Sequence, residues 1–255
     1  GSTGDISIVL YFIAQNSYSE IQAEGYEEKI EASQHMRACM EILREEFDRR
    51  GLTIDETNDP NLTGLIGLSG SAITTSRGIL SDKLTGLNPN FAAVLVDMLI
   101  SIRARPGDYI AVGMTAANPG INLALFSAMH TLELNPVVIT SVGSSMFGAN
   151  REEFTWLDME KVLQEHGLIE FTSIAASIGG GSDIGRGLPA LGRDLIVENI
   201  EQHGIIYINE GDLDGNIERR MEIYDDFLPE RTRYRSFVNI GGGLANVGAS
   251  VNASL

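Results

Sequence analysis

The sequence is poor in basic residues, with 18 lysines and arginines against 35 aspartates and glutamates, which gives a formal net charge of -17. A field of this sign repels phosphate backbones, so we expect no nucleic acid partner. Cys39 is the single cysteine, which excludes an intrachain disulfide. The apolar run from Ile6 to Ala14 is far shorter than the roughly 20 residues that a membrane-spanning helix needs.

Several cofactor and catalytic motifs are incomplete. Asn246 stands where a dinucleotide fingerprint starting at Gly241 needs its third glycine, and no Gly-Lys-Ser or Gly-Lys-Thr string of a P-loop occurs. The pattern places His35 and His130 inside helices and His166 and His203 at helix C-termini. A Ser-His-Asp triad therefore has no histidine available as its base. Because the dinucleotide and P-loop motifs are missing, we also expect no cofactor.

One acidic cluster imitates the start of a calcium loop. Glu210, Asp212 and Asp214 have the right spacing, but Met221 stands where the closing bidentate glutamate belongs. We therefore expect no metal site there. Asp212 or Asp214 is better explained as the N-cap of the helix that runs to Phe227.

The sequence does contain a regular alternation of apolar runs and helical patterns. Apolar residues recur at helical spacing from Ser19 to Arg50, which predicts a long amphipathic helix at the N-terminal side. The predicted strands are Leu65 to Leu68, Tyr109 to Val112, Val137 to Ser141, Thr172 to Ser177, Ile205 to Ile208 and Phe237 to Ile240. The predicted helices between them are Asn90 to Arg103, Gly120 to Glu133, Thr155 to His166, Asp194 to His203 and Asp214 to Phe227.

This alternation predicts an α/β fold. We expect a three-layer arrangement, in which a parallel sheet of about six strands carries helices on both faces, because the strands are apolar throughout. Residues 19–255 form one domain in this interpretation. Residues 1–18 are expected to be a linker or an anchor-proximal segment.

The loops that leave the predicted strands are rich in glycine, serine, threonine and asparagine. The C-terminal ends of parallel strands lie at one edge of a sheet, so these loops gather into one site. Glycines let backbone N–H groups approach a ligand, and the following helix N-termini add positive partial charge, so the site suits a carboxylate or a phosphate. For a single loop, the alternative is that its glycines only make a tight turn. The candidate ligand-binding residues are Ser69, Gly70, Ser71, Thr74, Thr75, Arg77, Thr115, Asn118, Asn122, Ser144, Ser145, Asn150, Gly180, Gly181, Asp183, Arg186, Gly242 and Gly243.

The same loops hold candidates for catalysis. Lys83 follows the first loop and could pair with Ser71 or Ser76 in a Ser-Lys arrangement, although an ion pair or a ligand contact is favoured for it. Asp183 is the carboxylate of the fourth loop. Whether the protein is an enzyme stays open at this point.

Several motifs in order resemble the poly-γ-glutamate system protein family. The similar segments are Thr63 to Gly67, Ile73 to Leu80 with Lys83, Asn88 to Ala93, Gly107 to Asn122, Ser144 to Ser145, Gly148 to Asn150, Phe154 to Glu160 and Asn239 to Gly243. They span roughly residues 32–248. The segment from Gly107 to Ser141 also looks loosely like a phosphosugar-binding module of the sugar-isomerase type, at the level of the fold alone.

The resemblance implies a pathway rather than a reaction. It implies an accessory component of poly-γ-glutamate capsule biosynthesis or export, extracellular and membrane-associated, that works beside the membrane components of the same system. Its ligand would be poly-γ-glutamate or a short end of it, and an oligomer is possible. The alternatives are a γ-glutamyl amide hydrolase or transferase that uses Ser/Lys chemistry, and a phosphosugar-binding, isomerase-like module.

Overall fold

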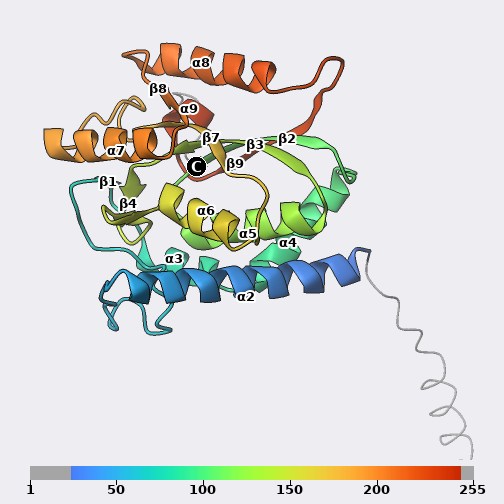
Figure 1. The fold of residues 1–255 in the computed structure, drawn as a ribbon, viewed down its shortest axis with the longest axis horizontal. Coiled ribbons are helices and arrows are strands. Elements are labelled where there is room, and N and C mark those ends of the chain that lie inside the picture. Colours follow the sequence, from blue (N-terminus) through green and yellow to red (C-terminus); the bar gives the residue numbers. More distant parts are fainter. Residues whose placement is uncertain (1–23, 248–255) are drawn as a thin grey trace, which may run out of the picture.

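A parallel sheet of five strands organises the molecule (Figure 1), whose computed structural model describes residues 24–247. The expectation for residues 1–18 lies outside this range. The strands are β2 (Tyr109–Thr115), β3 (Asn135–Ser141), β7 (Ser173–Ser177), β8 (Ile206–Ile208) and β9 (Tyr234–Ile240). Their order in the sheet is β8-β7-β3-β2-β9, with every neighbouring pair parallel. The chain thus steps outward from β2 to β8 and then returns to the other side of β2.

The predicted strand from Leu65 to Leu68 is wrong. This segment is buried as predicted, yet it runs as irregular chain outside the sheet. The Asn150 side chain takes the place of a strand partner, because its Oδ1 accepts from the Leu68 amide at 2.7 Å and its Nδ2 donates to the Leu68 carbonyl at 2.8 Å. A buried backbone needs its hydrogen bonds satisfied, but a side chain can satisfy them as well as a strand.

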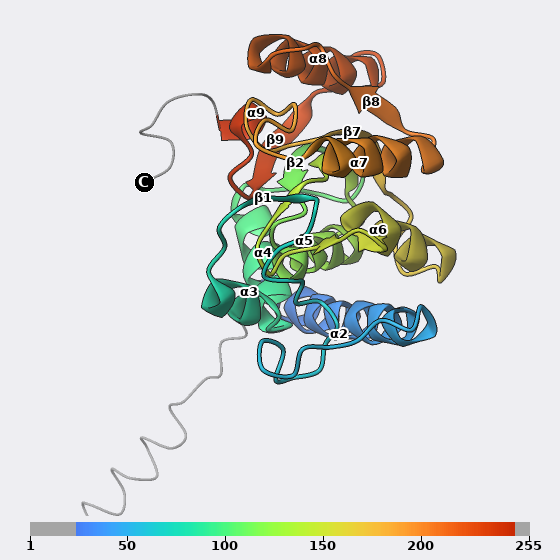
Figure 2. The ribbon, with the colours of Figure 1, turned by 90° about the vertical axis from the view of Figure 1, so that its left-hand side faces the viewer.

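Helices cover both faces of the sheet, as predicted. The helices α5 (Pro119–Thr131), α6 (Trp156–Glu165) and α7 (Ala190–Gln202) pack on one face, and α8 (Leu213–Asp226) packs on the other. An additional layer of α2 (Tyr26–Arg49) and α4 (Asn90–Ser101) lies outside α5 (Figures 1 and 2). The structure therefore has the three expected layers, helix, sheet and helix, and a fourth layer formed by α2 and α4.

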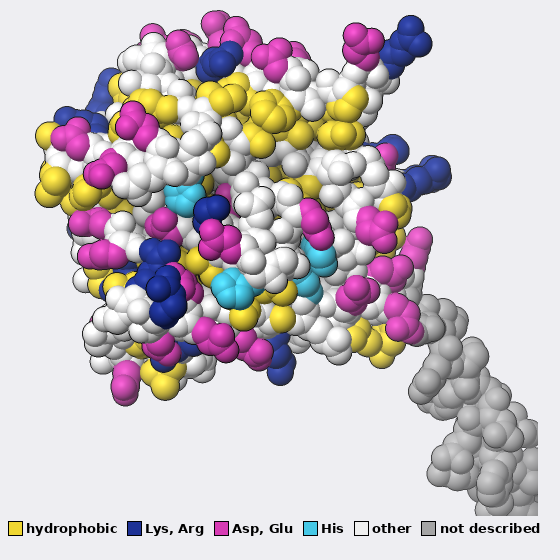
Figure 3. All heavy atoms as spheres, in the orientation of Figure 1, with side chains coloured by type: hydrophobic (Ala, Val, Ile, Leu, Met, Phe, Trp, Pro, Cys, Tyr) yellow, Lys and Arg dark blue, Asp and Glu magenta, His cyan; other side chains and the backbone are white. Residues whose placement is uncertain are grey.

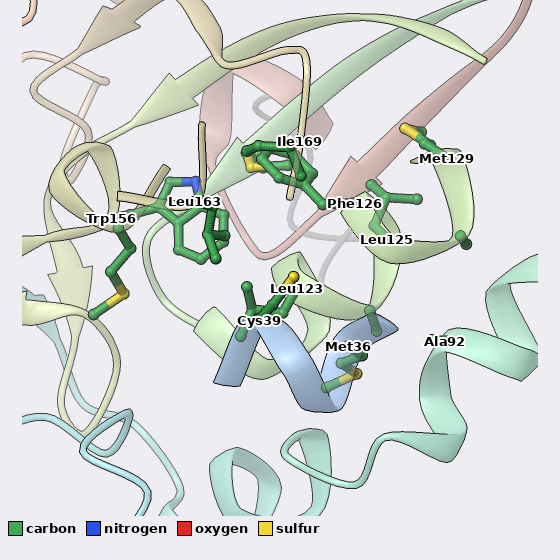
Figure 4. Close-up of a cluster of buried hydrophobic side chains, with 14 of the residues drawn as sticks. Met36, Cys39, Ala92, Leu123, Leu125, Phe126, Met129, Trp156, Leu163 and Ile169 are labelled. Atoms are coloured by element: carbon green, nitrogen blue, oxygen red, sulfur yellow. The ribbon is translucent and has the colours of Figure 1, made fainter. Parts of the chain in front are cut away.

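The long N-terminal helix is confirmed, with its described start at Tyr26 after Gly25, whose φ is 69°. Its buried stripe follows the helical period through Ala32, Met36, Cys39, Leu43 and Phe47. This stripe packs on α5 and α4, where Met36, Cys39, Leu123 and Phe126 share one core (Figure 4). Burying a methionine, leucine or phenylalanine side chain contributes about 1.5–3 kcal/mol, so this contact holds α2 firmly on α5 and α4.

Alternation along β2 explains why helices are needed on both sides of it. Ile110, Val112 and Met114 pack toward α5, whereas Ala111 packs toward α8, where the Tyr224 ring lies. The Tyr224 hydroxyl donates to the Val112 carbonyl at 2.8 Å. This bond ties α8 to the sheet.

Short elements that the sequence pattern does not predict surround the carboxyl edge of the sheet. They are the parallel pair β1 (Thr74–Ser76) and β4 (Ser144–Ser145), the antiparallel pair β5 (Asn150–Arg151) and β6 (Phe154–Thr155), and the helices α3 (Leu80–Gly86) and α9 (Leu244–Val247). Most of them are two to four residues long, too short to show a period.

Acidic side chains are spread over the face seen in Figure 3, with basic ones among them.

Between residues 24 and 247, no single helix is long and apolar enough to cross a membrane, although the pair α3 and α4, bent by 75°, reaches the required length and composition together.

Candidate functional site

A cleft of about 570 Å³ lies at the carboxyl ends of β2, β3 and β9. Thr115 ends β2, Ser141 ends β3 and Ile240 ends β9, and all three residues line the cleft. The strand order reverses between β2 and β9, and ligands of open α/β sheets bind at such a point. The carboxyl edge is turned toward the viewer in Figure 2, where β1, β2, β9 and α9 lie close together.

The glycine loop after β9 forms one wall of this cleft. Gly241, Gly242 and Gly243 line it, and their amide nitrogens donate no hydrogen bond to any acceptor within residues 24–247. Gly241 has a φ of 98°, and a Cβ there would lie 2.2 Å from Thr115 Oγ1. Consecutive free amides of this kind form a concave donor surface for an anion.

Two cations of the cleft form no ion pair or side-chain hydrogen bond within residues 24–247. Arg77 and Lys83 both line it, and neither side chain forms an ion pair or a hydrogen bond with another residue of the described chain. Partial burial lowers the pKa of Lys83, and the neighbouring Asp82 carboxylate partly offsets this effect. A partly desolvated ammonium gains more from an anionic ligand than one in water does.

The structure brings eleven of the predicted site residues together. Those that line the cleft are Thr75, Ser76, Arg77, Lys83, Thr115, Asn118, Ser145, Gly180, Gly181, Gly242 and Gly243. They come from the five segments that the sequence pattern places at one edge of the sheet. Their contact with a ligand stays a prediction.

Nine predicted site residues lie outside the lining. They are Ser69, Gly70, Ser71, Thr74, Asn122, Ser144, Asn150, Asp183 and Arg186. Their contact with a ligand also stays a prediction, and their surroundings in the structure give most of them other partners.

Most of the nine hold the loops in shape. Thr74 Oγ1 accepts from the Ser71 amide at 2.9 Å and from Asn150 Nδ2 at 2.9 Å. Ser144 is buried and donates to the Ala116 carbonyl, and Asn122 is buried and donates to the Thr115 carbonyl. These polar groups satisfy buried backbone instead of a ligand. The Arg186 backbone bonds to Gly181, while Ser69 and Gly70 are exposed beyond the cleft.

Asp183 lies beneath the cleft rather than on its rim. Its side chain is 1% exposed and pairs with Arg220 of α8, whose side chain is 3% exposed, at 3.0 Å. Sequence reasoning missed Arg220. A signal existed: Asn216, Arg220 and Tyr224 recur every four residues on the buried side of α8, and a polar residue on such a stripe needs a buried partner.

Ser141 is a second residue that sequence reasoning missed. It lines the cleft, donates to Asp183 Oδ1 at 2.9 Å and accepts from Arg220 Nη2 at 3.1 Å. Because it is the last residue of a predicted strand, the pattern assigned it to the sheet. It connects the cleft to the buried ion pair.

None of the four histidines lines the cleft. His166 and His203 cap the C-termini of α6 and α7, as predicted, and His203 Nε2 lies 3.1 Å from Asp158 Oδ1. Asp212 caps α8 by accepting from the Gly215 amide at 2.8 Å, which is one of the two caps predicted. Within residues 24–247, no three His, Cys, Asp or Glu side chains gather in a metal-binding group.

No known protein family, curated protein or solved structure matches the chain. The functional proposal therefore rests on the chemistry of the cleft and on the resemblance of the loop sequences.

Proposed function

We propose that the cleft binds an anionic group of a small ligand, such as the glutamyl carboxylate at a short end of poly-γ-glutamate. In this proposal the protein is an accessory binding component of poly-γ-glutamate capsule synthesis or export. It would act outside the cytoplasm, beside the membrane components of that system. The pathway, location and partners come from the resemblance of the loop motifs.

The observation that carries the proposal is the pair of unpartnered cations. The chain has a net charge of -17, yet Arg77 and Lys83 face one cleft against a single lining carboxylate, Asp82. An arginine and a lysine can each give a charge-assisted hydrogen bond to a carboxylate, worth about 1.5–3 kcal/mol. The free amides of the Gly241 to Gly243 loop add donors in the same cleft.

Charge also limits the length of the ligand. A long polyanion is repelled by the net charge of -17, whereas a chain end places only a few carboxylates beside Arg77 and Lys83. We therefore expect short γ-glutamyl oligomers to bind better per chain end than the polymer does.

Calorimetry tests the proposal directly. Titration with γ-linked glutamate oligomers of two to five residues should release heat, and affinity should fall as salt rises. The matching oligomer with amidated carboxyl groups keeps the backbone and removes the charges, so it should not bind. Absence of heat for the acidic oligomer at millimolar concentration would contradict the proposal.

A second candidate is cleavage or transfer at a γ-glutamyl amide. One observation favours it: Ser76, Ser145 and Lys83 line the same cleft, which places hydroxyl groups and an amine of a Ser-Lys arrangement in one site. Ser71, the other serine considered for this role, instead bonds to Thr74 Oγ1. Following polymer length during incubation separates the candidates, because a binding component leaves the length unchanged.

A further inference from the structure

Arg220 is the most deeply buried cation that has a described contact with the cleft. It projects from α8 toward the carboxyl ends of β3 and β7, where its Nη2 donates to Ser141 Oγ at 3.1 Å and to Ser177 Oγ at 2.8 Å. The same nitrogen lies 3.0 Å from Asp183 Oδ2. One guanidinium group thus reaches two strand ends and one loop.

Asp183 fixes the loop that contains Gly180 and Gly181. Its Oδ1 accepts from Ser141 and Ser177 at 2.9 and 2.8 Å, while its Oδ2 faces Arg220. Asp183 and the preceding Ser182 have φ values of 61° and 56°, a left-handed conformation that non-glycine residues rarely adopt. The buried ion pair therefore holds this loop in a shape that its residues do not favour by themselves.

The opposite side of the guanidinium holds the second glycine loop. Arg220 Nη1 donates to Asn246 Oδ1 at 3.3 Å, and Asn246 lies in α9 directly after Gly241 to Gly243. Gly113 leaves the room for this contact, since a Cβ there would lie 2.7 Å from Asn246 Oδ1. The Asn246 amide also bonds back to the Gly243 carbonyl at 2.9 Å.

We infer that Arg220 is a positioning residue that holds both glycine loops of the cleft, one through Asp183 and one through Asn246. This inference rests on the proposed function, in which the backbone amides of the two glycine loops donate to an anionic ligand. Asp183 balances the charge of Arg220, so Arg220 acts through the loops rather than as an anion contact. Loops fixed before binding lose little conformational freedom when the ligand enters, which raises affinity.

Hydrogen exchange of the full chain tests the positioning without any ligand. In Arg220→Lys, exchange should rise about tenfold at the hydrogen-bonded amides of the two loops, within residues 178–187 and at Asn246 and Val247 in the peptide 241–247, while α2 keeps its protection. Arg219→Lys is the control, because Arg219 is the neighbouring residue of α8 and pairs with Glu222 on the surface. It should leave both peptides unchanged. In Asn246→Ala, exchange should rise in residues 241–247 alone.

Outcomes outside this pattern overturn the inference. Arg220 does not position both loops if exchange in Arg220→Lys rises in neither loop or in only one of them. The same holds if exchange rises equally throughout the domain. If Arg220→Lys does not fold, the Asn246→Ala result decides, and unchanged exchange in residues 241–247 counts against the link.

Titration of the same proteins with a γ-linked glutamate tetramer separates this inference from the proposed function. The wild-type chain should bind it, and Arg220→Lys should bind it about tenfold more weakly. A wild-type chain that binds no tetramer contradicts the proposed function, whereas the exchange pattern still decides the positioning role.

Discussion

Asp183 Oδ2 lies 3.0 Å from Arg220 Nη2, and this pair is buried directly under a cleft whose own cations form no ion pair or hydrogen bond within the described residues. The two charges of the pair neutralise one another, so the positive character of the cleft comes from Arg77 and Lys83. The fold thus separates two tasks. Buried charges shape the loops, and half-buried or exposed ones remain available to a ligand.

Removing one charge of the buried pair should be costly. Arg220→Met leaves Asp183 without its counter-charge, and a buried unpaired charge of this kind costs about 3–5 kcal/mol. Urea denaturation measures the loss. Arg219→Met removes a half-buried arginine that pairs with the exposed Glu222 on the same helix, and it should change stability by less than about 0.5 kcal/mol. Equal effects of the two variants would contradict the structural role assigned to the pair.

Glu160 should make stability depend on pH. Full burial raises the pKa of its carboxyl from 4.5 to about 7, although the Ser173 amide and hydroxyl both donate to it. The folded state therefore holds a proton that the unfolded state releases, so stability should fall as pH rises from about 4.5 to about 7.

Glu160→Gln removes this dependence, because glutamine cannot ionise. The stability of the variant relative to the wild type should therefore increase across the same pH window, on the order of 3 kcal/mol for a shift of this size. Urea midpoints measured in parallel at several pH values give the difference. A difference that stays constant with pH would show that Glu160 titrates normally.

Gly192 allows α7 to approach the first cleft loop. A Cβ at this position would lie 1.9 Å from the Ala72 carbonyl oxygen. Alanine is favoured over glycine within a helix by about 1 kcal/mol, but a clash with backbone of this severity costs more, typically 1–3 kcal/mol. Gly192→Ala should therefore lower the melting temperature. Gly70→Ala is the control, because a Cβ at Gly70 meets no atom within 4 Å.

Cys39 should be inert in the folded protein. It is fully buried between α2 and α5 (Figure 4), and burial raises the pKa of its thiol to about 12. The thiolate is the reactive form, so an aromatic disulfide reagent at pH 8 should label no thiol in the native chain. It should label one thiol per chain in denaturant. Rapid labelling without denaturant would mean that the outer helix layer opens readily.

The fold could be predicted from sequence where a pattern extends over several residues. The apolar runs at β2, β3, β7, β8 and β9 identified all five strands of the main sheet. The segment Leu65 to Leu68 has the same composition, but the Asn150 side chain bonds to its backbone in place of a strand. An apolar composition indicates that a segment is buried, but it does not indicate which groups form hydrogen bonds with the backbone of that segment.

The site could be predicted only in part, for a related reason. Glycines and hydroxyl residues after strand ends pointed to the cleft, and Arg77 and Lys83 lie in it. The burial of Asp183 depends on Arg220, which is 37 positions away in the sequence. A contact over that distance is set by the packing of α8 on the sheet, which no local pattern contains.

Binding of a γ-linked glutamate tetramer to charge-neutral variants of the cleft tests the central claim most directly. Arg77→Gln and Lys83→Gln each remove one unpartnered cation, and Lys161→Gln, which removes an exposed lysine paired with Glu165, is the control. We predict that the wild type and Lys161→Gln bind the tetramer equally, and that each cleft variant binds it about tenfold more weakly. Equal binding by all four proteins would contradict the claim.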